Sequence, residues 1–244
     1  MHERMGHAPV PVLRQLVNKR MVKDIKMSSD IQDSSACRGY QQGKMVQKSF
    51  KSNTEKRTFG AFELLHFDIC GPIEVESIDG SKYLLLIVDE ASGLMKGFCL
   101  PHKSDSEAAL KKFIVQVGNQ YSKRVKFVRH DGAKEFATNS IKQFYADRGI
   151  EQQVTVPYAH QANGTAERAI RSIVTISRSM LHHVRLDKSF WAEAAMTTIY
   201  IKNRLPSPKS DSKTPFEMVN KFKPSVKHMR VFGCLAYVLT PKEK

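Results

Sequence analysis

The sequence lacks any long hydrophobic run. None of its apolar stretches approaches the roughly 18 residues that a membrane-spanning helix needs, so we expect no membrane partner. The first ten residues, MHERMGHAPV, carry charged residues and histidines where a secretory signal requires an apolar segment. These two absences favour an intracellular protein.

Cysteine is also scarce. The four cysteines of the 244-residue chain, Cys37, Cys70, Cys99 and Cys234, are widely separated along the sequence. Disulfide frameworks belong to short, cysteine-dense secreted chains. The distribution here therefore favours reduced thiols over a disulfide scaffold.

Acidic residues are few compared with basic ones. The chain has 24 Asp and Glu against 39 Lys and Arg, which gives a formal net charge of +15. Nucleic acid is the commonest partner of so one-sided a charge, and the alternative is a basic protein that binds polyanions loosely. With 41% hydrophobic residues the chain also has enough apolar material for a sizeable core. We therefore expect a folded protein that contacts nucleic acid.

The composition divides the chain into four regions. Residues 1–45 contain a short helix-like pattern followed by polar residues, and residues 46–58 have the polar, lysine-rich composition of a linker. Residues 59–205 hold the apolar segments of the main domain. Residues 206–244 are expected to form an extension with a short helix and strands.

The hydrophobic pattern of residues 59–205 predicts a mixed α/β domain. Strand-like segments cover 62–69, 82–90, 97–101, 125–131 and 152–156, and helical spacing covers 104–121, 139–149 and the segment after the turn-rich residues 162–164. Ser104 and Glu107 have the spacing of a capping box. In the last helix, Ala166, Ile170, Ile173, Ser177 and Met180 form a packing stripe. This succession of elements is typical of a layered α/β fold.

Three acidic residues occupy unusual places in this pattern. Asp68 lies inside an apolar strand, where a charge without a partner is costly. Asp131 ends a strand, and Glu167 lies in the first turn of a basic helix. Each has an ordinary alternative: Asp131 as a turn former, and Glu167 in a surface salt bridge with Arg171. The sequence leaves two roles open for His66, near the first acid: a packed strand residue or a site residue.

Clustered carboxylates without basic partners would call for divalent cations, because they repel one another. Ligand sets made of oxygen alone suit Mg²⁺ or Mn²⁺. Two such ions can activate a water or a 3′-hydroxyl and stabilise the leaving oxygen at phosphorus. The residue types therefore point to phosphoryl-transfer chemistry on a nucleic acid.

The spacing of the acids and the sequence around them are distinctive. Asp68 and Asp131 are separated by residues 69–130, and Asp131 and Glu167 by the 35 residues 132–166. The segments around them read HFDICGP, RHDGAKEF and PYAHQANGTAERAIRSI, and FWAEAAMTTIYIKNRLP, TPFEMV and KPSVKHMRVFGCLAYV follow. In all of these the chain resembles the D,D-35-E integrase of copia-type LTR retrotransposon Pol polyproteins. The corresponding segments of that family read H-x-D-x-C-G-P, R-S-D-N-G-G-E-F and P-Y-T-P-Q-Q-N-G-V-A-E-R.

The resemblance implies an RNase H-like core, which is a mixed five-stranded sheet flanked by helices. It implies DNA integration, in which the ends of element DNA are trimmed and joined to target DNA with two Mg²⁺ or Mn²⁺ ions. Asp68, Asp131 and Glu167 would be the catalytic metal ligands. The residues expected to contact DNA are Gln161, Asn163, Arg168, Arg171, Arg178 and Lys134. Expected partners are both DNAs and further copies of the chain, in the nucleus when the target is chromosomal.

The loop after Asp131 departs from the pattern of the family. The family has Asn-Gly-Gly at this point, and here the residues are Gly132, Ala133 and Lys134. A positive φ at either of the last two positions would cost roughly 1 kcal/mol or more. Lys134 would also bring a cation close to the expected metal ligands.

The N-terminal region departs further. Integrases of this type begin with a His-His-Cys-Cys zinc module, and His2, His7 and Cys37 match three of its ligands. Tyr40 stands where the fourth ligand is expected. Because structural zinc needs four ligands, the residue chemistry favours a metal-free, helical remnant of the module, with weak zinc binding as the alternative.

These departures leave two functions of different classes open. One is an active integrase, and the other is a catalytically silent nucleic-acid-binding relic of a truncated retrotransposon. An RNase H-like nuclease of another kind would share the chemistry but leave the segments after residue 190 unexplained.

Overall fold

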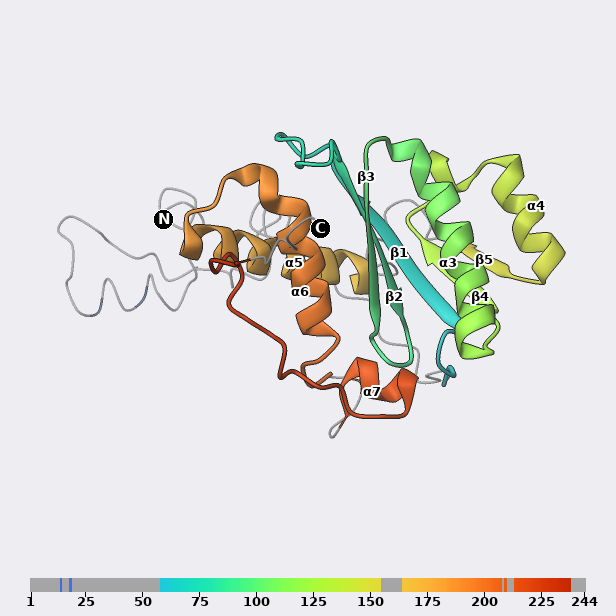
Figure 1. The fold of residues 1–244 in the computed structure, drawn as a ribbon. Helices are drawn as coiled ribbons and strands as arrows, with labels where there is room; N and C mark the ends of the chain where they lie inside the picture. The colour runs from blue at the N-terminus through green and yellow to red at the C-terminus, as the bar shows by residue number, and fades with distance from the viewer. Residues whose placement is uncertain are drawn as a thin grey trace, which may run out of the picture. The chain divides into compact units, whose positions relative to one another are not determined.

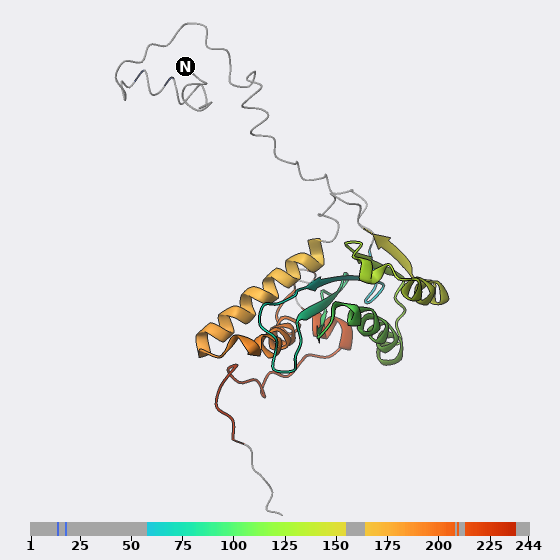
Figure 2. The ribbon, with the colours of Figure 1, turned by 90° about the horizontal axis from the view of Figure 1, so that it is seen from above.

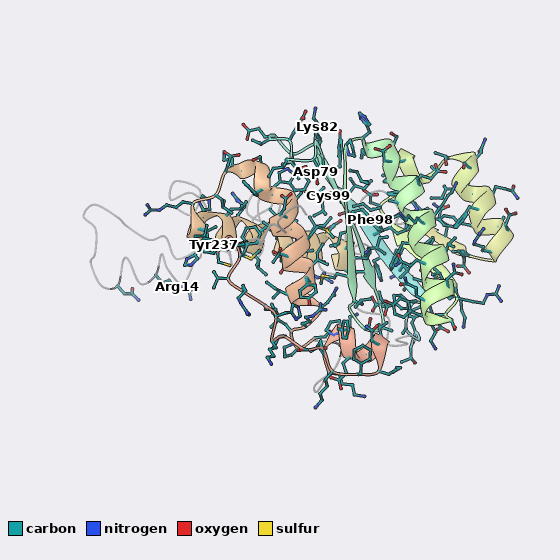
Figure 3. The ribbon with its side chains drawn as sticks, in the orientation of Figure 1. Arg14, Asp79, Lys82, Phe98, Cys99 and Tyr237 are labelled. Atoms are coloured by element: carbon teal, nitrogen blue, oxygen red, sulfur yellow. The ribbon has the colours of Figure 1, made fainter. Side chains whose placement is uncertain are left out.

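A computed structural model describes residues 58–154, 164–207, 209 and 213–237, together with the isolated positions 14 and 18. The chain divides into two units, Met1–Lys56 and Arg57–Lys244. In the first unit the described residues are Arg14 (labelled in Figure 3) and Asn18, and both are helical. The predicted zinc-module residues and the loop residues Gln161 and Asn163 lie outside the described residues.

Five strands form one mixed sheet in the second unit (Figure 1), as the resemblance predicts. They are β1 (Leu64–Cys70), β2 (Tyr83–Asp89), β3 (Met95–Leu100), β4 (Phe127–His130) and β5 (Glu151–Val154). Their spatial order is β3-β2-β1-β4-β5. Strand β1 pairs antiparallel with β2 and parallel with β4, while β2 and β3 are antiparallel and β4 and β5 are parallel.

Helices cover both faces of this sheet. On one face lie α3 (Ser106–Tyr121) and α4 (Asn139–Arg148), and on the other lie α5 (Gly164–Val184) and α6 (Trp191–Lys202), as Figures 1 and 2 show. The short helices η3 (Lys103–Asp105), η4 (Lys134–Phe136), η6 (Lys188–Phe190) and α7 (Pro215–Asn220) connect or follow them. Within the described residues of the region 206–244, the structure has α7 and no strand. None of the described helices is long and apolar enough to cross a membrane.

Alternating side chains of the central strands contribute to two separate hydrophobic cores. Leu85 and Ile87 of β2 pack with α3 and α4, whereas Leu84, Leu86 and Val88 pack with α5 and α6. The neighbouring residues Phe98 and Cys99 of β3, labelled in Figure 3, divide between the cores in the same way. Because both faces of β2 are buried, its sequence is a continuous apolar run instead of an alternating one.

Most of the predicted helix features are confirmed, and one is wrong. The stripe on α5 is buried at Ala166, Ile170, Ile173 and Ser177, with Met180 partly buried against it. The predicted capping box is not formed, because Ser104 lies inside η3 and α3 begins two residues later. The carboxylate of Glu107 instead bonds the ammonium of Lys111 and accepts from the hydroxyl of Thr138, the N-cap of α4.

The segment KNRLP, which begins with the last residue of α6, has a structural explanation. The side chain of Asn203 accepts a hydrogen bond from the Met95 N–H and donates one to the Met95 carbonyl, each at 2.8 Å. It therefore satisfies the backbone of Met95, the first residue of β3, as a neighbouring strand would. The guanidinium of Arg204 lies 3.3 Å from the ring centroid of Tyr200 and 4.8 Å from that of Phe216, which joins α6 to α7.

Candidate active site

The strand register brings the first two acids together. Leu64 lies opposite Phe127 and His66 opposite Arg129 in the parallel pair β1–β4. Continuing this register by two positions places Asp131, the residue after β4, beside Asp68. The ends of neighbouring parallel strands are common ligand sites in open α/β sheets.

Both carboxylates accept a hydrogen bond from the backbone that follows them. Asp68 Oδ1 accepts from the backbone N–H of Ile69 at 2.8 Å, and Asp131 Oδ1 accepts from the backbone N–H of Ala133 at 3.0 Å. Positive φ falls on Gly132 (+82°), not on Ala133, and Lys134 begins the helix η4. The backbone strain considered for the changed loop therefore does not arise, because a glycine occupies the position that needs one.

The third acid reaches the same region from a helix. Helix α5 packs on β1 and β2, and Glu167 lies in its first turn, partly buried. Among the ion pairs of the described residues none involves Glu167, so the surface salt bridge with Arg171 is not formed. Glu167 therefore does not have the role of a surface salt-bridge partner, which was its ordinary alternative.

The charges of the other two acids act on Asp68. Burial raises the pKa of Asp68 to about 6, and the charges of Asp131 and Glu167 contribute to the rise. The Ile69 N–H and the charge of Lys103 oppose it. Lys103, which sequence reasoning missed, is held 3.2 Å from Glu135 Oε1 in the segment after Asp131. A partly buried, acid-rich site of this kind would be stabilised by a divalent cation.

The acids are not gathered into a coordination shell. Among the described residues, no group of three His, Cys, Asp or Glu side chains is close enough to hold a metal ion. The donor set nevertheless fits Mg²⁺ or Mn²⁺, since it consists of carboxylate oxygens alone and the neighbouring acids destabilise the charged form of Asp68.

Helix α5 carries three arginines after Glu167. Arg168, Arg171 and Arg178 are all exposed. The guanidinium of Arg168 lies over the start of the helix, where a Cβ placed on Gly164 would be 2.6 Å from its Nη1. The side chain of Lys134 lies outside the part of the chain that the structure describes. An acid beside exposed arginines suits a surface that meets phosphates.

His66 is a packed strand residue. It is 1% exposed, and its Nε2 lies 2.9 Å from Glu90 Oε2, while Glu90 Oε1 accepts from Lys209 Nζ at 2.8 Å. This chain of contacts ties β1 to the segment after α6. The sequence left the role of this histidine open, because Glu90 and Lys209 are far from it along the chain.

The same contacts predict how acid affects stability. The contact with His66 Nε2, followed by that with Lys209, holds the pKa of Glu90 at about 2, below its ordinary value of 4.5. The carboxylate thus stabilises the fold fully above pH 4.5, and this contribution disappears as the pH falls toward 2. Glu90→Gln should lower the free energy of unfolding by about 1–2 kcal/mol at pH 7, allowing for its partial exposure. Urea unfolding between pH 7 and pH 3 should show the two proteins converging at acid pH, and a constant difference would contradict the assignment.

Known proteins resemble the chain in sequence and in fold. No protein-family model matches the chain. The chain is 33% identical over 243 residues to the retrovirus-related Pol polyprotein from transposon TNT 1-94 of Nicotiana tabacum, which covers 100% of the chain and 18% of that protein. It is 25% identical over 239 residues to the Pol polyprotein from transposon RE2 of Arabidopsis thaliana, covering 97% of the chain and 16% of that protein. The chain therefore spans less than a fifth of the length of these curated relatives.

Two solved structures share the fold. One is the simian T-cell lymphotropic virus intasome in complex with the PP2A regulatory subunit B56 gamma, with a TM-score of 0.57, 16% identity and coverage of 81% of this chain and 66% of that chain. The other is the HTLV-2 integrase catalytic core domain in complex with magnesium, with a TM-score of 0.50, 16% identity and coverage of 67% and 99%. These likenesses show that the sheet and its helices have the fold of an integrase catalytic core.

Proposed function

Because the chain is a homologue of copia-type retrotransposon Pol polyproteins and has the fold of an integrase catalytic core, we propose that it acts in DNA integration as a metal-dependent polynucleotidyl transferase. The reaction would trim the ends of element DNA and join their 3′-hydroxyls to target DNA. The observation that carries the proposal is the parallel register of β1 and β4, which, continued by two positions, would bring Asp131 beside Asp68. The influence of Glu167 on the pKa of Asp68 supports it.

The three acids would hold Mg²⁺ or Mn²⁺, and the magnesium complex of the HTLV-2 core supports that choice. When bound, two such ions supply Lewis-acid chemistry at phosphorus. Asp68 offers its carboxylate from a central strand, braced by the Ile69 N–H, and Asp131 offers its own from a turn braced by Ala133. Glu167 approaches from α5, at the end where DNA phosphates would meet the arginines.

DNA would bind along the basic surface of α5. Arg168, Arg171 and Arg178 are exposed and would contact phosphates without reading the sequence. Gln161, Asn163 and Lys134 are the further contacts that the resemblance suggests. The likeness to an intasome subunit supports self-association of the chain on DNA, in the nucleus when the target is chromosomal.

The test is transfer of a labelled DNA end into plasmid with Mn²⁺. Wild-type protein should form joined product with Mn²⁺ and none with EDTA, and Glu167→Gln should reduce the rate by about 100-fold or more. Glu151→Gln is the matched control, because Glu151 is an exposed acid on the edge strand β5. It should leave the rate unchanged.

The alternative is a catalytically silent DNA-binding relic. It is favoured by Tyr40 in the zinc module and by the lack of a formed coordination shell among the described residues. A relic would bind DNA with a strong salt dependence but join no ends. Equal, salt-sensitive binding by wild type and Glu167→Gln, without product from either, would establish it.

A further inference from the structure

We infer that His130 is a positioning residue that fixes the turn bearing Asp131, an inference that rests on the proposed function of that acid. His130 is the last residue of β4 and is 0% exposed. Its ring stacks on Phe67 of β1, with centroids 5.0 Å apart and planes 15° apart, and meets the ring of Phe136 edge-on at 5.4 Å. Packing on two sides fixes the plane of the imidazole.

That orientation aims one ring nitrogen at the turn. Nδ1 of His130 accepts a hydrogen bond from the backbone N–H of Gly132 at 3.0 Å. The next backbone N–H, that of Ala133, is accepted by Asp131 itself. On the other side of the ring, Nε2 lies 2.6 Å from the side-chain amide of Gln152 on β5. The imidazole therefore links the turn to the sheet.

The turn is tight, so its support has consequences for the carboxylate. Gly132 has a φ of +82°, and a Cβ on it would lie 3.0 Å from Val154 Cγ1. Without the acceptor at residue 130, the Gly132 N–H would have no partner from that side chain, and the turn would lose one of the two bonds that set the direction of Asp131. Outer-shell groups that orient ligands typically change metal affinity by about 10–100-fold when they are removed.

The sequence change fits this role. The family pattern has Ser-Asp-Asn here, and this chain has His130, Asp131 and Gly132. A serine is too short to reach both the Phe67 ring and the Gly132 N–H. The histidine and the glycine therefore work as a pair, with the glycine adopting the conformation and the histidine bonding its N–H.

Three substitutions in the full chain separate positioning from packing. In His130→Asn the amide oxygen takes the place of Nδ1, in His130→Gln it lies one bond further out, and His130→Leu has no acceptor. Mn²⁺ affinity is measured by electron paramagnetic resonance of the free ion, without DNA. Hydrogen exchange of the Gly132 N–H is followed after ¹⁵N-glycine labelling, which marks 13 residues. Strand transfer is measured against Mn²⁺ concentration.

Leu and Gln at position 130 should weaken Mn²⁺ binding and speed Gly132 exchange by about 10-fold, while Asn stays within about threefold of wild type. Strand transfer by the Leu variant should recover at high Mn²⁺. Wild-type affinity in the Leu variant, or equal losses in Leu and Asn, would overturn the inference. Wild-type protein that binds no Mn²⁺ would overturn the proposed function, and the Gly132 exchange series would still decide whether His130 holds the turn. Wild-type protein that binds Mn²⁺ but joins no DNA would likewise overturn the proposed function, and the binding series would still decide the role of His130.

Discussion

Asp68→Asn is expected to abolish strand transfer and, without divalent metal, to stabilise the protein. The carboxylate is partly buried, and burial together with the charges of Asp131 and Glu167 raises its pKa to about 6. At pH 7 the folded protein therefore carries a charge that its surroundings disfavour. Asparagine keeps the oxygen that accepts from the Ile69 N–H and removes the charge.

The expected gain is about 1–2 kcal/mol, reduced from the full effect of the shift because the group is partly exposed to water. For a protein of this size that corresponds to a rise in Tm of roughly 2–8 °C in EDTA. Strand transfer should fall by about 100-fold or more, since the proposed function makes Asp68 a metal ligand. Adding Mn²⁺ should raise the Tm of wild type and leave that of the variant unchanged, because only a ligand that binds the folded state stabilises it.

Asp79→Asn is the matched control for this experiment. Asp79 is an exposed acid in the connection between β1 and β2 (labelled in Figure 3), and its replacement should change neither Tm nor activity. A variant Asp68→Asn that is less stable than wild type in EDTA would show that the carboxylate serves the fold. A variant that still joins DNA ends would remove Asp68 from the proposed set of metal ligands.

Local patterns were enough to predict the layers of the fold. The continuous apolar run of β2 reflects burial on both faces, and the stripe on α5 reflects burial on one. The spacing of Asp68, Asp131 and Glu167 pointed to a common site, and the parallel register of β1 and β4, continued by two positions, places the first two beside each other. The hydrophobic patterns depend on residues that are close in sequence. The relation between the three distant acids came from the resemblance to a known family.

What could not be predicted depends on side-chain partners far apart in the sequence. Asn203 bonds the backbone of Met95, 108 residues away, and nothing near either residue indicates it. His66 pairs with Glu90, which comes from the end of a different strand. The acceptor role of His130 depends on how Phe67 stacks against its ring, and hydrophobic periodicity carries no information about ring orientation.

The segment HFDICGP contains both a residue of the candidate site and residues that serve the fold. Asp68 belongs to the candidate site, whereas His66 and Cys70 are held in ion-pair and packing contacts. Gly71 is required by its surroundings: it has a φ of +140°, and a Cβ on it would lie 2.6 Å from Tyr83 Cδ1 and 2.7 Å from the Lys82 carbonyl oxygen. A match to this motif therefore reports the fold of β1 at least as strongly as its chemistry.

Gly71→Ala should accordingly lower the free energy of unfolding by about 3 kcal/mol or more. Positive φ costs an alanine roughly 1–2 kcal/mol, and the clash with a backbone carbonyl adds about 1–3 kcal/mol because neither partner is free to move far. Gly80→Ala is the matched control in the same connection, since it also has a positive φ (+76°) but no atom within 4 Å of the added Cβ. It should cost only about 1–2 kcal/mol.

Urea unfolding of the two variants measures the difference directly. A larger loss in Gly71→Ala would attribute the glycine of the motif to close backbone packing at the end of β1. Equal losses would show that the conformation alone selects glycine and that the chain between β1 and β2 shifts to admit a methyl group. In that case strand transfer by the folded Gly71→Ala protein should also fall, because Gly71 is three residues from Asp68 and a shift there would move the carboxylate.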